Sequence, residues 1–460
     1  MTEITQPYAP TKLTPGHDGE PTLARRLGPF DATMIVMGGI IGAGIFVNPS
    51  NVAREVHTGR LILGAWGIGG VIALIGAFVY AELAALRPRV GGQYAYLRDA
   101  YHPMVAFVYG WTLLLVVQTG GMAGAAIICG RYFRELTGLG VPEQVIAGAT
   151  LAILTLVNCL GVKAGSNVQS GLMVTKLLAI TMLIGVGYII ATPSTAIAPT
   201  SAATGGATGL AAAMIPVLFA YGGWQTASFV SGEMRDPQKD LPRGLLVGVI
   251  GVIVLYLAVT YVCLRVLGVD GLAATRTPAS EVMRQALGDR GARLIALGIA
   301  VSTVGFLSQS VLTAPRVYYA MARDGVFFSA VGKLDPRTRA PVVAIVLQGV
   351  WAAIIALTGK YDQILNYVEA IDVLFFGLTG ASLIVFRMRE RHDSVGTRAN
   401  RIRVPGHPFT TLVFVLACWG VAITTVVQQP RSAGIGVVIL LAGVIVFQFW
   451  RKRTPISSLD

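Results

Sequence analysis

Charged residues are scarce in this chain: Asp, Glu, Lys and Arg make up 13% of its 460 residues, whereas apolar residues make up 54%. Soluble domains carry about 25% charged residues. This composition excludes an ordinary soluble domain. It indicates an integral membrane protein with many spans.

Cysteine and histidine are also scarce. The four cysteines, Cys129, Cys159, Cys263 and Cys418, all fall in or at the edges of apolar runs, which argues against a disulfide framework. The five histidines lie in predicted loops or tails, and no cluster of His and Cys has the spacing of a metal site. We therefore expect no metal and no cofactor.

Long apolar runs are what the sequence has in abundance. Twelve of them are long enough to cross about 30 Å of hydrocarbon as helices. They span residues 30–50, 61–86, 103–130, 145–161, 171–191, 210–231, 245–264, 294–313, 342–357, 364–386, 409–427 and 433–450. Residues 1–29 are polar and contain no apolar core with a cleavage site, so we expect an N-terminal tail without a signal peptide and a second tail at residues 451–460.

The net charge of +13 is distributed unevenly along the chain. With twelve spans, one side of the membrane receives about 24 Lys and Arg residues and the other about 11. The side with more positive charge is the cytoplasmic one, because positively charged loops are retained there. This pattern predicts that both termini are cytoplasmic, and it explains the basic charge without a nucleic-acid partner.

Two of the apolar runs are interrupted by glycine, as GGIIGAG at residues 38–44 and FAYGGW at residues 219–224. Each unsatisfied backbone group costs several kcal/mol in hydrocarbon, so irregular backbone survives there only where protein or a polar ligand satisfies it. Glycines at this spacing also allow close helix packing. Two interrupted spans in the two halves of one chain favour an opened backbone, which is the sequence sign of a transporter binding site.

An opened backbone of this kind can hold the head of an α-amino acid. Its free N–H groups suit a carboxylate and its free carbonyl groups suit an ammonium, so no charged side chain is needed. Phe219 and Tyr221 could instead serve apolar packing. The predicted substrate-binding residues are Ile41, Gly42, Ala43, Gly44, Phe219, Ala220, Tyr221 and Gly222.

Ionisable residues within the runs are the remaining signals. Lys176 lies one to two turns into the run 171–191, where an unpaired charge is expensive, although its stem could snorkel to the headgroups. Glu82 and Glu233 are predicted to be ion-pair partners at an inner gate or in a loop, the alternative being that they are substrate ligands. Glu369 and Asp372 either face water at the outer mouth or take part in proton coupling. The expected partners of the two gate residues are Arg87, Arg235, Lys239 and Arg323.

Several motifs in order resemble the L-type amino acid transporter family of the amino acid-polyamine-organocation superfamily. They are GIIGAGIFV at residues 39–47, YAEL at 80–83, GGQYAY at 91–96, VNC at 157–159, LFAYGGW at 218–224 and EMRDP at 233–237. The likeness covers nearly the whole chain. Ala43 departs from the pattern, because many members have Ser there.

The resemblance implies an all-α fold of twelve transmembrane helices with a five-plus-five inverted repeat. Helices 1–5 fall within residues 30–191, helices 6–10 within 210–386, and helices 11 and 12 within 409–450. Helices 1 and 6 are discontinuous in this fold. The family also implies that Phe219 gates the substrate and that the Lys176 ammonium takes the place of a sodium ion beside the unwound part of helix 1.

The implied function is sodium-independent exchange of L-amino acids, with proton-coupled symport as the alternative. We expect neutral substrates, because no acidic residue is predicted beside the interruptions. An enzyme would need convergent carboxylates or histidines, and a channel would need a repeated filter. Eukaryotic members attach to a glycoprotein through a cysteine between helices 3 and 4, and residues 131–143 contain none. A stand-alone carrier of the bacterial inner membrane is therefore predicted.

Overall fold

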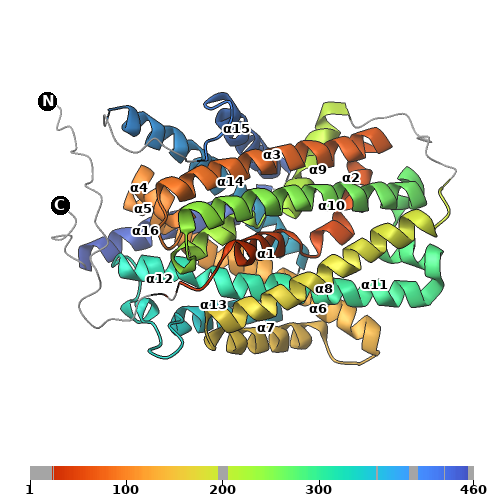
Figure 1. The fold of residues 1–460 in the computed structure, drawn as a ribbon, viewed down its shortest axis with the longest axis horizontal. Coiled ribbons are helices and arrows are strands. Elements are labelled where there is room, and N and C mark those ends of the chain that lie inside the picture. Colours follow the sequence, from red (N-terminus) through yellow and green to blue (C-terminus); the bar gives the residue numbers. More distant parts are fainter. Residues whose placement is uncertain are drawn as a thin grey trace.

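The computed structural model describes residues 23, 25–194, 206–358, 361–392, 402–428 and 430–453. Within these ranges the regular structure is helical, apart from one isolated parallel bridge between Leu27 and Met234. Figure 1 shows the helices side by side, most of them running along the long axis of the molecule.

The helices of the first half of the chain are α1 (Pro29–Ile40), α2 (Gly44–Val56), α3 (Gly59–Leu86), α4 (Gln93–Ala100), α5 (Pro103–Thr112), the π-helical η1 (Leu113–Val117), α6 (Gln118–Thr137), α7 (Glu143–Cys159) and α8 (Val162–Ile189). Those of the second half are α9 (Gly206–Tyr221), the 3-10 helix η2 (Trp224–Glu233), α10 (Pro237–Ala274), α11 (Pro278–Thr313), α12 (Pro315–Arg323), η3 (Ser329–Gly332), α13 (Val342–Thr358), α14 (Tyr361–His392), α15 (Phe409–Gln428) and α16 (Pro430–Arg453).

Seven described helices are long and apolar enough to cross a membrane, and the bent pair α1 and α2 makes an eighth span if it is counted as one. Three shorter apolar helices, Glu143–Cys159, Val342–Thr358 and Gly434–Trp450, lie in three more of the predicted runs. The all-helical, multi-span architecture is therefore as predicted. The number twelve stays a prediction.

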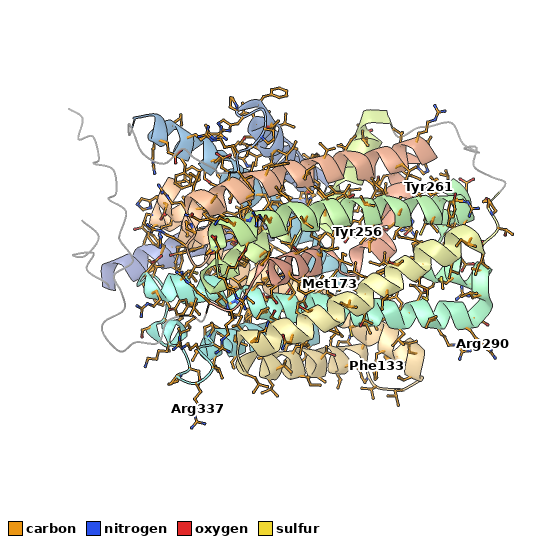
Figure 2. The ribbon with its side chains drawn as sticks, in the orientation of Figure 1. Phe133, Met173, Tyr256, Tyr261, Arg290 and Arg337 are labelled. Atoms are coloured by element: carbon orange, nitrogen blue, oxygen red, sulfur yellow. The ribbon has the colours of Figure 1, made fainter. Side chains whose placement is uncertain are left out.

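The two ends of the bundle carry different connections. Figure 2 labels Arg337 and Arg290 at opposite ends, which we call the Arg337 end and the Arg290 end. The colours of Figure 1 show that α3 ends and α10 begins at the Arg337 end. This end holds the connections that the charge distribution predicts to be cytoplasmic.

Helix α1 lies in the middle of the bundle and packs against α10, η2, α8 and α11. Glycines on α10 make the approach of the two helices possible. A Cβ at Gly244 would lie 2.7 Å from Cβ of Ala32, and one at Gly248 would lie 2.6 Å from Cγ1 of Val36. In a membrane the hydrophobic effect does not drive helices together. Small residues at such a contact let the backbones approach closely, and van der Waals packing then stabilises the pair.

Both glycine-rich segments interrupt their helices. Helix α1 ends at Ile40, α2 begins at Gly44, and the two axes differ in direction by 42°. Helix α9 ends at Tyr221, Gly223 has φ of +102°, and the chain continues as η2. The two segments touch, because a Cβ at Gly223 would lie 2.1 Å from the carbonyl oxygen of Gly39.

Gly223→Ala should therefore destabilise the protein. Alanine at this φ costs about 1–3 kcal/mol in strain, and the backbone of Gly39 cannot move away as a side chain would. The expected result is a lower melting temperature of the purified protein in detergent. Gly64→Ala in α3 is the control, because a Cβ there meets nothing within 4 Å. Equal melting temperatures of the two variants would contradict the close contact.

Candidate functional site

A cavity of about 130 Å³ lies between the two interruptions. It is lined by α1, α2, η1, α6, α9, η2, α11 and α14. Its lining consists of Gly39, Ile40, Gly42, Ala43, Gly44, Val117, Gln118, Gly121, Ala125, Ile128, Leu218, Phe219, Ala220, Gly222, Gly223, Gln225, Thr226, Phe306, Gln309, Ser310, Val368, Asp372, Val373 and Phe376. Small residues and backbone from the two interruptions form one wall of this cavity.

Six of the eight predicted binding residues line the cavity: Gly42, Ala43, Gly44, Phe219, Ala220 and Gly222. Ile41 and Tyr221 are not among its lining residues. The Tyr221 ring is buried against Trp66 and Tyr256, with ring centroids 5.6 and 5.2 Å away. The packing alternative that the sequence left open therefore applies to Tyr221, and contact of the other residues with substrate stays a prediction.

The N-terminus of α2 presents backbone N–H groups to this cavity. A helix leaves its first N–H groups without an intrahelical acceptor, and they carry the positive end of the helix dipole. No side chain caps this helix at Ala43. Ala43 and Gly44 line the cavity, and the N–H of Phe46 donates to the carbonyl of Ala43 (3.1 Å), so the N–H groups of Gly44 and Ile45 are the donors that this helix start can offer an anionic group.

The carbonyl groups at the end of α1 already have partners. The buried Lys176 ammonium donates to the carbonyl oxygens of Ile41 (2.5 Å) and Gly38 (3.4 Å). The hydroxyl of Tyr256 donates to the carbonyl of Ile40 (2.9 Å), and that of Ser302 donates to the carbonyl of Gly42 (3.3 Å). The snorkelling alternative for Lys176 is wrong, because its side chain turns inward and is 0% exposed.

Protein donors thus occupy the carbonyls of Gly38, Ile40, Ile41 and Gly42. At the C-terminal end of α9, Phe219 and Ala220 line the cavity, and the carbonyl of Phe219 accepts from the backbone N–H of Gly222 (3.2 Å). Asn48 of α2 holds the two elements together by donating to the carbonyl of Pro216 in α9 (2.9 Å).

Several polar lining residues were missed by the sequence analysis, among them Gln118 of α6 and Gln309 and Ser310 of α11. Asp372 of α14 was singled out, but for the outer mouth or for proton coupling and not for this cavity. Their sequence signal was a polar residue within an apolar run, but only the fold shows that three distant helices point them at one cavity. Asp372 lines the cavity of the two interruptions, so the expectation of no acidic residue beside them was wrong.

Comparison with known proteins agrees with this arrangement. A family model described as amino acid permease matches residues 27–449. The chain belongs to the amino acid permease family. The resemblance to L-type amino acid transporters within the amino acid-polyamine-organocation superfamily is thereby confirmed, and this permease is a multi-pass membrane transporter of amino acids rather than an enzyme.

Individual relatives match the permease over nearly its whole length. The serine/threonine exchanger SteT of Bacillus subtilis (strain 168) is 28% identical over 95% of this chain and 99% of its own. The human large neutral amino acids transporter small subunit 2 is 28% identical over 96% of this chain and 83% of its own. The mouse Asc-type amino acid transporter 1 is 27% identical over 94% and 82%, respectively.

At the Arg337 end the permease is held together by buried ion pairs. Nε and Nη2 of Arg316 donate to the two carboxylate oxygens of Glu233 at 2.6 and 3.3 Å, and both side chains are 1% exposed. The carbonyl of Glu233 also accepts from the backbone N–H groups of Arg26 and Leu27 (2.9 and 3.0 Å). The segment before α1 is thus hydrogen-bonded to the last residue of η2.

Glu82 forms a second ion pair, in which Glu82 is 6% and Arg387 23% exposed. Arg387 of α14 donates to both of its carboxylate oxygens at 2.7 Å, and the backbone N–H of Val404 donates at 2.6 Å. Glu82 and Glu233 therefore both lie in ion pairs, as predicted, and their role as a gate stays a prediction. The expected partners were wrong. Arg316 of α12 and Arg387 of α14 are far from Glu233 and Glu82 in the sequence, and only the fold brings them together.

A third polar cluster joins α4 to the end of α12. Arg98 and Tyr94 both donate to the carboxylate of Asp324, the tyrosine at 2.8 Å. Burial, with a further contribution from the Asp324 charge, raises the pKa of Tyr94 well above its ordinary value. Tyr94 therefore stays protonated and remains a donor at any physiological pH.

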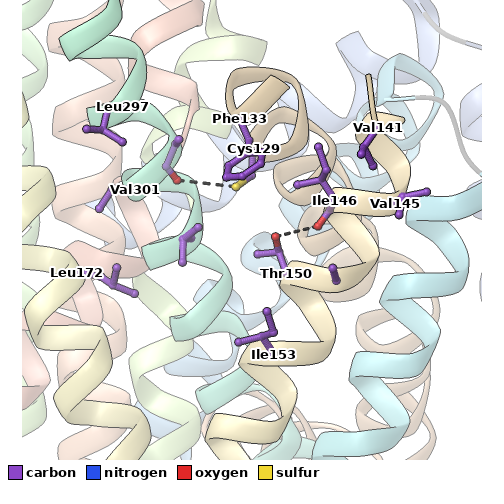
Figure 3. A pocket seen from close by; sticks show the side chains of 13 residues that line it. Cys129, Phe133, Val141, Val145, Ile146, Thr150, Ile153, Leu172, Leu297 and Val301 are labelled. Carbon is purple, nitrogen blue, oxygen red and sulfur yellow. Dashed lines mark hydrogen bonds between the residues drawn. The ribbon is translucent and has the colours of Figure 1, made fainter. Parts of the chain in front are cut away.

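The second described cavity is apolar and lies away from the interruptions. It has a volume of about 530 Å³ and lies between α6, α7, α8 and α11. In Figure 3 the two polar contacts among its lining residues are Cys129 Sγ to the carbonyl of Ala300 (4.0 Å) and Thr150 Oγ1 to the carbonyl of Ile146 (2.9 Å). No charged side chain lines it, so it does not suit the two charges of an amino acid.

The side chain of Glu369 lies outside the described residues.

Lys176→Met should impair transport while the protein still inserts and folds. Methionine keeps the stem but leaves the Ile41 carbonyl buried without a donor, so we expect uptake by reconstituted vesicles to fall at least about tenfold. Lys239→Met is the control, since Lys239 is 66% exposed. Normal uptake by the Lys176 variant would contradict the assigned role.

Arg316→Met should destabilise the permease strongly, by about 3–5 kcal/mol, because it leaves the Glu233 charge buried and unpaired. Adding Glu233→Gln should recover part of the loss, because no charge is then buried. Thermal unfolding in detergent measures both. Arg284→Met is the control, since its exposed pair with Glu281 contributes at most about 1 kcal/mol. A similar decrease in melting temperature for Arg316→Met and Arg284→Met would contradict the prediction that burial makes the Arg316 pair costlier to break.

Proposed function

We propose that the permease has the complete twelve-span fold with two inverted repeats. In this proposal α1 with α2 is the discontinuous helix 1, and α9 with η2 is the discontinuous helix 6. The first repeat covers residues 30–191 and the second residues 210–386, with helices 11 and 12 in 409–450. The 42° bend between α1 and α2 and the left-handed Gly223 support this assignment.

We propose further that transport is sodium-independent exchange of L-amino acids. The observation that carries this is the Lys176 ammonium on the carbonyls of Ile41 and Gly38. A fixed cation at the end of α1 satisfies the carbonyls that a cotransported metal ion would otherwise need to satisfy. A carrier that uses no such ion equilibrates amino acids across the membrane, and the printed name of the Bacillus relative is that of an exchanger.

Neutral amino acids are the proposed substrates. The α2 N-terminus takes the carboxylate and the end of α9 takes the ammonium, so the head of any α-amino acid is held without reference to its side chain. Two relatives are named for serine and threonine and for large neutral amino acids. Phe219 is proposed to close over the bound substrate, since it is half-buried and lines the cavity.

The proposed setting is the bacterial inner membrane, with the Arg337 end in the cytoplasm and both termini on that side. The ion pairs of Glu233 and Glu82 then form the closed inner gate. The name of the human relative calls it a small subunit. This permease is proposed to work without a disulfide-linked heavy subunit, because the predicted site of attachment at residues 131–143 contains no cysteine.

Vesicles preloaded with unlabelled amino acid should take up labelled neutral amino acid several times faster than empty vesicles, and sodium should make no difference. The reason is that an exchanger returns faster with substrate bound than empty. Uptake measured over a panel of the twenty amino acids identifies the substrate.

An imposed pH gradient tests the alternative function, proton-coupled symport. If acid outside drives accumulation in empty vesicles and preloading has no effect, the permease is a proton-coupled symporter and the exchange proposal fails.

A further inference from the structure

The apolar cavity between α6, α7, α8 and α11 opens toward the lipid. Three side chains of its lining are strongly exposed, Ile153 by 60%, Val145 by 51% and Leu297 by 47%. Figure 3 shows Leu297 and Val301 on one side of the cavity and Val145 and Ile153 on the other. Exposed apolar side chains of a membrane-spanning helix face hydrocarbon, so the molecules that can enter this cavity are those of the bilayer.

The cavity extends over one half of the bilayer. Phe133, which belongs to its lining, lies nearer the Arg290 end than the Arg337 end (Figure 2). From Glu143, the first residue of α7, to Ile153 in the lining, the helix rises about 15 Å. This is half of the roughly 30 Å of hydrocarbon in a bilayer. The length of the cavity therefore matches the acyl chains of a single leaflet.

The volume of the cavity matches one acyl chain. It is about 530 Å³, whereas apolar cavities of about 150 Å³ lined by Leu, Ile and Phe stay dry and bind benzene. On that scale the cavity holds roughly twenty carbon atoms. Cys129 and Thr150 already donate to the carbonyls of Ala300 and Ile146, so they offer no free donor to water. An empty void of this size would deprive the lining of van der Waals contacts, which a lipid chain supplies.

An arginine lies where the headgroup of such a lipid belongs. Arg293 is exposed and precedes Leu297 by one turn of α11, so both residues lie on the same face of the helix. Side chains lean toward the start of their helix, which directs Arg293 away from the cavity and toward the Arg290 end. Within the described part of the chain, no hydrogen bond or ion pair engages its guanidinium. The nearby carboxylate of Glu143, in contrast, is paired with Arg131 at 3.4 Å.

We propose that this cavity binds an acyl chain of a phospholipid and that Arg293 binds the phosphate of the same molecule. A guanidinium and a phosphate form charge-assisted hydrogen bonds, often two in parallel. The lipid belongs to the outer leaflet if the Arg337 end is cytoplasmic, as proposed above. The site itself does not depend on the proposed exchange function.

The bound chain would support the wall behind Lys176. Leu172 of the lining lies on α8, one turn before Lys176, and both side chains contact Gly305 of α11. A Cβ at Gly305 would lie 2.8 Å from Cε of Lys176 and 3.4 Å from Cβ of Leu172. A lipid chain in the cavity adds contacts to Leu172 and to α11, and so stabilises the contact between the two helices.

The test uses phosphatidylglycerol with a diazirine near the end of one palmitoyl chain, incorporated into phosphatidylethanolamine vesicles that contain the full-length permease. After irradiation, mass spectrometry locates the adducts. In the wild type they should concentrate on the deep lining residues Ile153, Leu172 and Val304. Ile423 of α15 gives the reference level for ordinary surrounding lipid, because it is 65% exposed and does not belong to the lining.

A matched pair of variants on α7 tests the cavity. Ala149→Trp fills it, because Ala149 is exposed and belongs to the lining, and adducts on the lining should fall at least about tenfold. Ala152→Trp is the control, since Ala152 is exposed on the same helix but does not belong to the lining. Val301→Trp is a second filling variant if Ala149→Trp does not fold, and the melting temperature reports folding.

Diacylglycerol with the same labelled chain tests the headgroup, because it lacks only the phosphoglycerol group. Phosphatidylglycerol should label the lining of the wild type several times more strongly than diacylglycerol does. Arg293→Gln should remove this difference. Arg60→Gln is the control, because Arg60 is exposed near the start of α3, at the same end of the bundle, and should leave the difference unchanged.

Two results would overturn the lipid site. The first is equal labelling of the lining in folded Ala149→Trp and Ala152→Trp, or in the wild type no more labelling of the lining than of Ile423. The second is equal labelling by phosphatidylglycerol and diacylglycerol in the wild type, which would mean that the cavity takes apolar molecules without regard to a phosphate. Neither measurement uses transport, so a failure of the proposed exchange leaves this test unaffected.

Discussion

The structure depends on satisfying backbone polar groups where two helices open in an apolar environment. The segments after Ile40 and Tyr221 have carbonyl and N–H groups that lipid cannot satisfy. Protein donors satisfy one set, because Lys176, Tyr256 and Ser302 donate to carbonyls at the end of α1. Residues at the start of α2 and the end of α9 line a cavity. There the backbone also satisfies part of its own groups, because the N–H of Phe46 donates to the carbonyl of Ala43 (3.1 Å) and the N–H of Gly222 to that of Phe219 (3.2 Å).

Close packing makes this division possible. Gly39 and Gly223 bring the two openings into contact, and Gly244 and Gly248 admit α1 to the surface of α10. The buried pairs Glu233–Arg316 and Glu82–Arg387 then fix the Arg337 end of the same helices. A pair that is fully buried, as Glu233–Arg316 is, is costly to break. The ion pairs and the cavity are formed by shared elements, because η2 and α14 contribute residues to both.

Much of this could be predicted from the sequence. The apolar runs required helices, the two glycine-rich interruptions marked where the backbone opens, and Lys176 stood out because a lysine is rare in an apolar run. These signals are local, since each follows from residues adjacent in the chain and from the cost of polar groups in hydrocarbon. Glu82 and Glu233 were recognised as ion-pair residues from the family resemblance, but their expected partners, Arg87, Arg235, Lys239 and Arg323, are not the ones that the fold supplies.

Tertiary structure decided what local signals could not. Arg316 and Arg387 reach Glu233 and Glu82 because α11, α12 and α14 return to the Arg337 end. This follows from how the helices pack, and the separation of these residues along the sequence does not predict it. Packing also turned Tyr221 into the core and Asp372 toward the cavity, against the expectation that no acid lies near the interruptions. The sequence by itself determined that this is a helical membrane protein with opened helices. Which side chains meet in the opening was decided only in three dimensions, because residues on different helices share a cavity through distances that the linear chain does not encode.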